Sequence, residues 1–127
     1  MALSSAYAKH PQHRIEIDEE RVGLRVSLRG EVLAHTTRGL NLREGNYPAV
    51  VYVPRDDVEM ERLTASDLST HCPFKGDASY FRCEGSEQHA ATEEVAWSYE
   101  TPFDQMEAIR GYLAFYVDRV TVERITD

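Results

Sequence analysis

The fold is decided by residues 22–35, which read V-G-L-R-V-S-L-R-G-E-V-L-A-H. Apolar side chains occupy every second position from Val22 to Leu28, a pattern typical of a β-strand with one buried face. Arg29-Gly30 then interrupts the pattern, and residues 31–35 resume it. A glycine-containing pair between two alternating runs favours a tight turn. The stretch therefore predicts an antiparallel hairpin.

Strand-like segments recur along the rest of the chain. Residues 14–18 alternate polar with apolar side chains, and residues 47–53 are rich in β-branched and aromatic side chains. We predict further strands at residues 14–18, 47–53, 79–83 and 95–99, and a last hairpin of residues 112–117 and 119–125 around Asp118-Arg119. Short helices are predicted at residues 58–63 and 104–110, the second with Thr101 as its N-cap. The fold class is thus mainly β: a single compact domain of antiparallel sheets curled into a sandwich or small barrel, with one or two short helices.

Composition limits what the chain does. It has 127 residues and 42% hydrophobic residues, enough for one globular domain. We expect residues 1–12 to be a loose N-terminal arm and residues 13–127 to be the single β-rich domain. The net charge of −8 argues against nucleic acid as a partner, because phosphate binding needs a basic face.

The apolar runs and the cysteines of the sequence predict the cellular location. No apolar run is long enough for a signal peptide or a membrane span, so we expect a cytoplasmic protein that does not bind membranes. The two cysteines are expected to be reduced thiols there. Pairing of strand edges in a homodimer stays open.

Candidate catalytic residues lie between residues 70 and 102. Cys72 is three residues before Lys75, and a nearby ammonium group would lower the pKa of a thiol and make it a nucleophile. The alternative is a small buried hydrophobic residue. Glu100 ends a predicted strand, where its carboxylate could act as a general base, anchor a ligand or pair with Lys75 or Arg55.

Candidate ligand-binding residues surround these three. Lys75 and Arg55 could each bind an anion, although Arg55 could instead pair with Asp56 or Asp57. A strand period of two places Val95, Trp97 and Tyr99 on one face, and Ala96, Ser98 and Glu100 on the other. The full set of expected ligand-binding residues is Arg55, Asp56, Tyr80, Trp97 and Tyr99. The spacings of cysteine and histidine match no zinc pattern, so no metal site is predicted, and the cofactor stays unknown.

Four motifs make the chain resemble a known family. They are Y-V-P-R-D-D-V (52–58), T-H-C-P-F-K-G-D-A-S-Y (70–80), A-W-S-Y-E-T-P (96–102) and I-R-G-Y-L-A-F-Y (109–116). In this order they resemble the small bacterial family known as domain of unknown function 427, over residues 13–125. The resemblance implies a compact β-rich domain, sometimes labelled a nucleotidyltransferase. The positions matching its recurrent polar motif residues are Arg55, Asp56, Thr70, Cys72, Lys75, Tyr80, Trp97, Tyr99 and Glu100.

Three hypotheses follow for function. The first is binding of a small anionic metabolite near Lys75, Arg55 and Glu100. The second is a structural or protein-interaction module without catalysis. The third is an enzyme that uses Cys72 as nucleophile or redox thiol, or that has the nucleotidyltransferase activity of the family label. That activity normally needs converging carboxylates that hold Mg²⁺, and neighbouring Asp56 and Asp57 rarely converge on one ion.

Overall fold

A computed structural model describes residues 6–10, 14–85 and 90–125. The strands are β1 (Ile15–Glu19), β2 (Gly23–Leu28), β3 (Glu31–Thr36), β4 (Leu40–Glu44), β5 (Val50–Val53), β6 (Leu63–Cys72), β7 (Gly76–Cys83), β8 (Glu94–Ser98), β9 (Leu113–Phe115) and β10 (Thr121–Ile125). The helical elements are α1 (Ala6–Lys9) and the 3₁₀ turns η1 (Arg55–Asp57), η2 (Met60–Arg62) and η3 (Asp104–Ile109). The expected mainly β class is confirmed.

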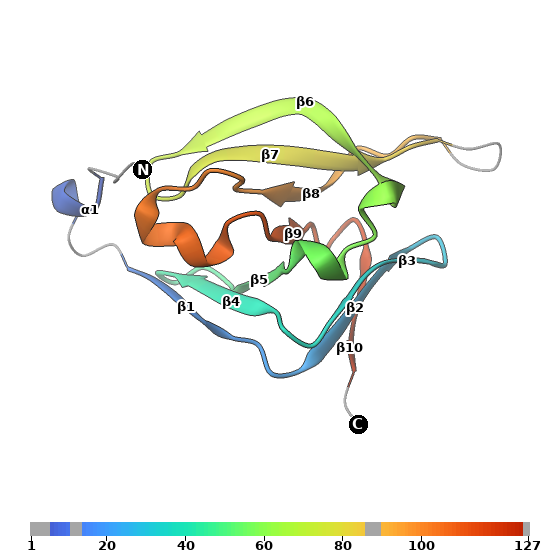
Figure 1. The fold of residues 1–127 in the computed structure, drawn as a ribbon, viewed down its shortest axis with the longest axis horizontal. Coiled ribbons are helices and arrows are strands. Elements are labelled where there is room, and N and C mark those ends of the chain that lie inside the picture. Colours follow the sequence, from blue (N-terminus) through green and yellow to red (C-terminus); the bar gives the residue numbers. More distant parts are fainter. Residues whose placement is uncertain (1–5, 11–13, 86–89, 126–127) are drawn as a thin grey trace.

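The described strands form two antiparallel sheets (Figure 1). The large sheet has the order β1-β4-β5-β9-β8-β7-β6, and the small sheet has the order β10-β2-β3. The large sheet is curled, with β6 and β7 at one end of it and β1 and β4 at the other. The arrangement is sandwich-like and is not a closed barrel.

The predicted hairpin of residues 22–35 is confirmed as β2 and β3. Arg29 and Gly30 have φ angles of 54° and 80° at the turn. Positive φ at both central residues is typical of a type I′ turn, whose twist matches that of the flanking strands. A glycine is therefore favoured at the second position, where it adopts this conformation without strain.

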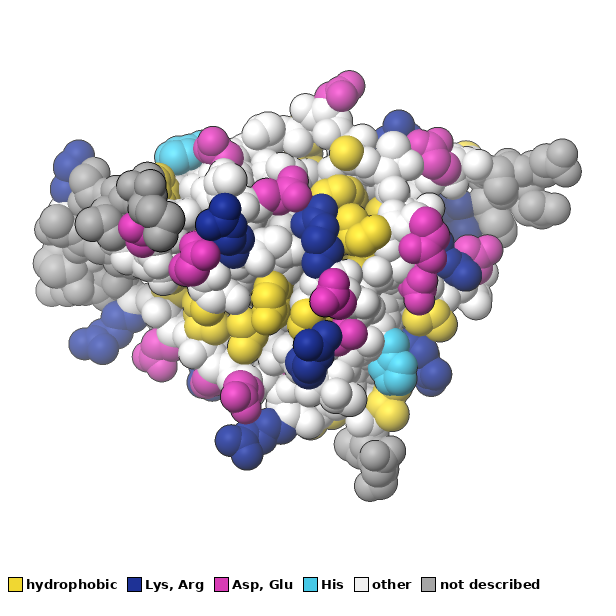
Figure 2. Space-filling view, in the orientation of Figure 1, with side chains coloured by type: hydrophobic (Ala, Val, Ile, Leu, Met, Phe, Trp, Pro, Cys, Tyr) yellow, Lys and Arg dark blue, Asp and Glu magenta, His cyan; other side chains and the backbone are white. Residues whose placement is uncertain are grey.

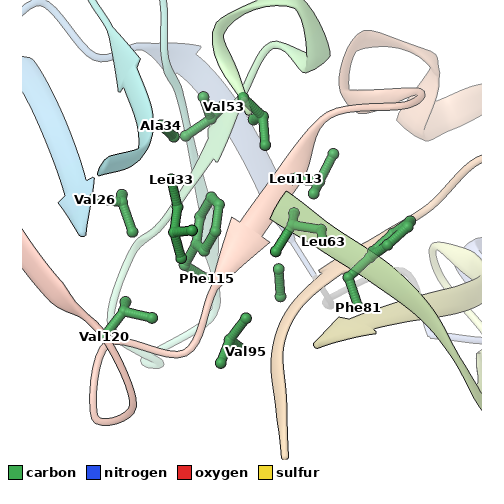
Figure 3. Packing of buried hydrophobic residues seen from close by; sticks show 12 residues of the cluster. Val26, Leu33, Ala34, Val53, Leu63, Phe81, Val95, Leu113, Phe115 and Val120 are labelled. Atoms are coloured by element: carbon green, nitrogen blue, oxygen red, sulfur yellow. The ribbon is translucent and has the colours of Figure 1, made fainter. Parts of the chain in front are cut away.

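The main core lies between the two sheets (Figure 3). Val26 and Leu33 of the small sheet face Val53, Leu113 and Phe115 of the large sheet. All five are at most 6% exposed. This layer covers one face of the large sheet and leaves its opposite face to build a second cluster.

The last predicted hairpin is wrong. β9 and β10 belong to different sheets: β9 pairs with β5 and β8, whereas β10 pairs with β2. After β9 the backbone turns tightly, since the N–H groups of Arg119 and Val120 both donate to the carbonyl of Tyr116. Val120 then enters the core, and the chain crosses to the small sheet. An alternating pattern alone does not say which sheet a strand joins.

The predicted helices are shorter than expected. Residues 104–109 form 3₁₀ turns with a break at Met106, and the N-cap is Phe103 without a side-chain cap, not Thr101. Residues 60–62 form one 3₁₀ turn, and β6 begins directly after it.

The described part of the N-terminal arm forms α1, followed by His10. Ala6 is 9% exposed, and the ring of His10 lies 6.1 Å from the ring of Phe74. The other residues of the expected arm, 1–5 and 11–12, lie outside the described residues.

Candidate functional site: an aromatic cavity on the second face of the large sheet

A row of side chains crosses five strands of the large sheet on the face that points away from the main core. The register aligns Leu40 of β4 with Tyr52 of β5, Ala114 of β9, Trp97 of β8 and Tyr80 of β7. Alternation along each strand puts these five on the same face. They form the floor of the second cluster.

Ala114 at the middle of the row lets its large neighbours meet. Tyr52 and Trp97 lie on either side of it, with ring centroids 6.4 Å apart in an edge-to-face arrangement. The indole N–H of Trp97 donates to the hydroxyl of Tyr52 at 3.2 Å. Two residues after Ala114, Tyr116 places its ring 4.7 Å from that of Trp97. The rings therefore form one connected wall.

Above this floor lies a cavity of about 250 Å³. Its lining is mostly aromatic and contains one cation and one carboxylate. The lining residues are Tyr47, Tyr52, Tyr80, Trp97, Tyr99 and Tyr116, the apolar Leu42, Pro48 and Val50, and the charged Glu44 and Lys75. A mainly apolar cavity with a few polar groups is the usual form of a small-molecule site.

Lys75 supplies the positive charge. It is only 9% exposed, and its Nζ donates to Oε1 of Glu44 at 2.7 Å. The ammonium also lies 6.0 Å from the centre of the Tyr99 ring. A buried ammonium needs such a counter-charge, because desolvation penalises the charged form.

The turn between β6 and β7 positions Lys75. The carbonyl of Lys75 accepts a hydrogen bond from the N–H of Phe103 at 3.0 Å, and Gly76 has a φ of 116°. A Cβ on Gly76 would lie 3.3 Å from Cα of Pro102. The turn therefore packs closely against residues 101–103, which fixes the backbone from which the lysine side chain extends.

Four of the residues expected at the site lie beside one cavity: Lys75, Tyr80, Trp97 and Tyr99. The expected faces of β8 need one correction. A register shift between Phe81 and Arg82 leaves Val95 as an extra residue, so Val95 packs in the main core with Ala96, and not with Trp97 and Tyr99.

Arg55 and Glu100 lie together, outside the cavity lining. Nη2 of Arg55 is 3.1 Å from Oε2 of Glu100, and Nη1 donates to the carbonyl of Gly111 at 3.1 Å. Both side chains are more than one third exposed. The alternative partners named for Arg55 are engaged differently: Asp57 accepts hydrogen bonds from Thr36 and Arg38, and Asp56 is exposed.

Cys72 is half-buried and packs against the second cluster. The ammonium group of Lys75, which was expected to approach this sulfur, is hydrogen-bonded to Glu44. The other thiol, Cys83, has a raised pKa because burial disfavours its thiolate. Across residues 6–10, 14–85 and 90–125, no group of three or more His, Cys, Asp or Glu side chains could hold a metal ion.

Sequence reasoning missed Glu44, Tyr52 and Tyr116. A signal was present for Glu44, because residues 40–44 read L-N-L-R-E and a period of two places Glu44 on the face of Leu40 and Leu42. The pairing with Lys75 depends on how the large sheet curls, which a strand pattern does not specify.

The cavity environment changes the acidity of its tyrosines. Burial raises the pKa of Tyr52 and of Tyr99 well above the usual value, and burial also raises the pKa of Tyr116. These hydroxyls are neutral at physiological pH, as ordinary tyrosines are, and each carries one O–H donor.

Comparison with known families gives a match over residues 16–126. The matching family model is NTP_transf_9, described as a domain of unknown function (DUF427). The chain belongs to this family. The resemblance inferred from the four motifs is thus confirmed, and the DUF427 description assigns no activity. No curated protein matches the chain.

Two further observations concern the surface charge and the helices of this DUF427 domain. Acidic and basic side chains are interspersed over the face shown in Figure 2. Among the helices of the described residues, none has the length and apolar character needed to cross a membrane.

Proposed function

We propose that this protein binds a small anionic metabolite in the aromatic cavity, with the anionic group at Lys75. The observation that carries the proposal is a lysine only 9% exposed at the wall of a cavity lined by six aromatic residues. Arg55 and Glu100 were expected in the same pocket from the sequence, but they lie outside the cavity lining and take no part in the proposed site.

Lys75 has donors to offer a ligand. An ammonium carries three N–H donors, and within the described residues Glu44 is the hydrogen-bond partner that the structure gives to Nζ. Charge-assisted hydrogen bonds are stronger than neutral ones, and weak solvation inside the cavity strengthens them further. Because the Glu44 carboxylate already neutralises the formal charge of the ammonium, a monoanion such as a carboxylate suits the site better than a multiply charged phosphate.

The rings would bind the rest of the ligand. The rings of Trp97 and Tyr116 line one side of the cavity, and Tyr99 lies beside the ammonium. Planar or apolar groups pack favourably on aromatic rings, and the protonated tyrosine hydroxyls would donate to oxygen atoms of the ligand.

We keep the cytoplasm as the proposed location of the protein, since Cys72 and Cys83 are free thiols.

A double variant tests the proposal. Lys75→Met combined with Glu44→Gln removes both charges together and leaves no unpaired buried ion. Its matched control is Arg62→Met with Glu31→Gln, an exposed ion pair of 2.8 Å between Nη1 and Oε2 outside the cavity. The probes are small aliphatic and aromatic carboxylates, each with its uncharged amide, and binding is measured by titration calorimetry.

The expected result is specific to the charge. Carboxylate affinity should fall about 10- to 100-fold in the cavity variant, as expected for a lost hydrogen bond to a charged group, and should not change in the control. Equal carboxylate affinities in the two double variants would refute the proposal.

A structural role for the ion pair is the alternative, and one observation favours it. The Lys75–Glu44 pair ties the turn between β6 and β7 to the end of β4, across the large sheet. In that case the Lys75→Met, Glu44→Gln variant would unfold at a lower denaturant concentration than the wild type. Neither the wild type nor this variant would bind a carboxylate probe.

A further inference from the structure

The aromatic cavity adjoins a second and larger one. This second cavity has a volume of about 500 Å³ and lies between the two sheets, lined from β2, β5 and β10 and from the segment that follows β9. The two cavities share five lining residues: Tyr47, Pro48, Val50, Trp97 and Tyr116. The Trp97–Tyr116 ring pair is therefore a wall common to both.

The second cavity differs from the first in chemistry. Apart from Asp118 and Arg124, every residue of its lining is apolar or aromatic. Arg124 is engaged, because its Nη1 lies 3.2 Å from Oε2 of Glu20. The wall that a ligand in this cavity would contact is therefore hydrocarbon except at Asp118 and Arg124.

The opening of the second cavity carries unusually exposed apolar side chains. Val117 is 74% exposed, Val122 is 37% exposed and the shared Tyr47 is 74% exposed. Isolated exposed apolar residues are common, but here three of them line one cavity that already has an apolar interior. Covering this surface would remove apolar area from water.

We propose that the ligand is an amphipathic carboxylate, whose anionic end binds Lys75 and whose apolar chain passes along Trp97 and Tyr116 into the second cavity. This inference rests on the proposed function, because it uses the same anion position. It adds the chemical class: a molecule with one acidic end and an extended hydrocarbon body. The gradient of the lining, from charged at Lys75 to apolar at Val122, matches that class.

The test is a series of straight-chain carboxylates, from butanoate through octanoate to dodecanoate, used below their micelle-forming concentrations. Binding to the full chain is followed by fluorescence of Trp97, the one tryptophan in the sequence, which lines both cavities. If added methylene groups enter the second cavity, affinity should rise about fourfold for each one buried.

Valine variants show where the chain lies. Val122→Asp should abolish the gain from chain length and leave butanoate affinity unchanged. Its matched control is Val32→Asp, because Val32 is also a 37% exposed valine of the small sheet but lies outside both linings. Val117→Asp is a second variant, at a position exposed enough that folding should tolerate the charge.

The outcomes separate the two proposals. Gain from chain length that is lost in Val122→Asp or Val117→Asp, and kept in Val32→Asp, supports the inference. Butanoate binding that depends on Lys75 but does not improve with length overturns the inference alone. A chain-length gain that persists in both Val122→Asp and Val117→Asp also overturns the inference alone. A series in which no carboxylate binds overturns the inference together with the proposed function.

Discussion

Gly76 shows how one residue can govern the candidate site. It holds a φ of 116°, a conformation that side chains other than glycine rarely adopt, and its backbone lies against Pro102 and Phe103. Lys75 directly precedes it and is hydrogen-bonded through its carbonyl to the N–H of Phe103. The position of the buried ammonium therefore depends on the absence of a Cβ at residue 76.

We predict that Gly76→Ala destabilises the protein by roughly 2–4 kcal/mol, from backbone strain and a close backbone contact together. The control is Gly30→Ala, at a φ of 80° with no heavy atom within 4 Å of the added Cβ. That variant should cost roughly 1 kcal/mol, the strain alone. Urea denaturation of both variants checks the difference, and equal losses would contradict it.

Single residues also show the reach of sequence reasoning at this site. The sequence motifs single out four candidate site residues that the structure places beside one cavity: Lys75, Tyr80, Trp97 and Tyr99. The pairing of Arg55 with Glu100 was one of the alternatives for Glu100, but the sequence did not favour it over a pair of Arg55 with Asp56 or Asp57, because it joins residues that only the folded chain brings together.

At the scale of elements, the segment from Glu100 to Gly111 covers the second cluster, and one side chain joins its two ends. Met106 and Ile109 of η3 are buried in that cluster. Arg55 contacts Glu100 at one end of the segment and Gly111 at the other, while the N–H of Gly111 donates to the carbonyl of Tyr99. One guanidinium thus bridges both ends of a segment whose middle consists of short 3₁₀ turns.

We predict that Arg55→Ala speeds amide hydrogen exchange in η3 and leaves exchange in β2 and β3 unchanged. The loss of global stability should be about 1 kcal/mol or less, since the ion pair is exposed and screened by solvent. Arg110→Ala is the matched control, because Arg110 makes an exposed ion pair with Glu107 inside the same segment. Equal exchange rates of η3 in the two variants would rule out the bridging role.

The elements differ in how far the sequence predicts them. The hairpin of β2 and β3 has strict alternation and a glycine turn, and it was predicted well. β6 was missed, because six of its ten residues are exposed at the edge of the large sheet and its side chains are mostly polar. Edge strands need little hydrophobic periodicity, so their sequences resemble loops.

At the scale of the whole molecule, Glu20 joins the two sheets. Its carboxylate accepts hydrogen bonds from the N–H of Val22, from Asn41 of β4 and from Arg124 of β10. The hydrogen bond from Val22 is the largest cause that lowers the pKa of Glu20 below its ordinary value of 4.5. Since the folded state favours the ionised form, Glu20 stabilises the fold above pH 4.5, and this contribution is lost as the pH falls through the lowered pKa.

We predict that Glu20→Gln is less stable than the wild type near neutral pH and that the difference shrinks as the pH falls below 4.5. Urea denaturation between pH 7 and pH 3 measures it. Glu123→Gln is the control, because Glu123 pairs with Arg25 on the exposed surface of the small sheet. A wild-type advantage over Glu20→Gln that stayed constant across this range would exclude the linkage.

The crossing of the chain from β9 to β10 has a consequence for the order of folding. β2 is the central strand of the small sheet, and one of its neighbours, β10, comes from residues 121–125. During synthesis, β2 and β3 can pair early, but one edge of β2 stays open until nearly all of the described chain has been made. Pairing of β2 with β10 closes a loop that contains most of the described chain, and long-range pairing of this kind slows folding of β topologies. Until then, the nascent chain exposes the backbone edge and the apolar face of β2, so chaperone protection would matter most over this interval.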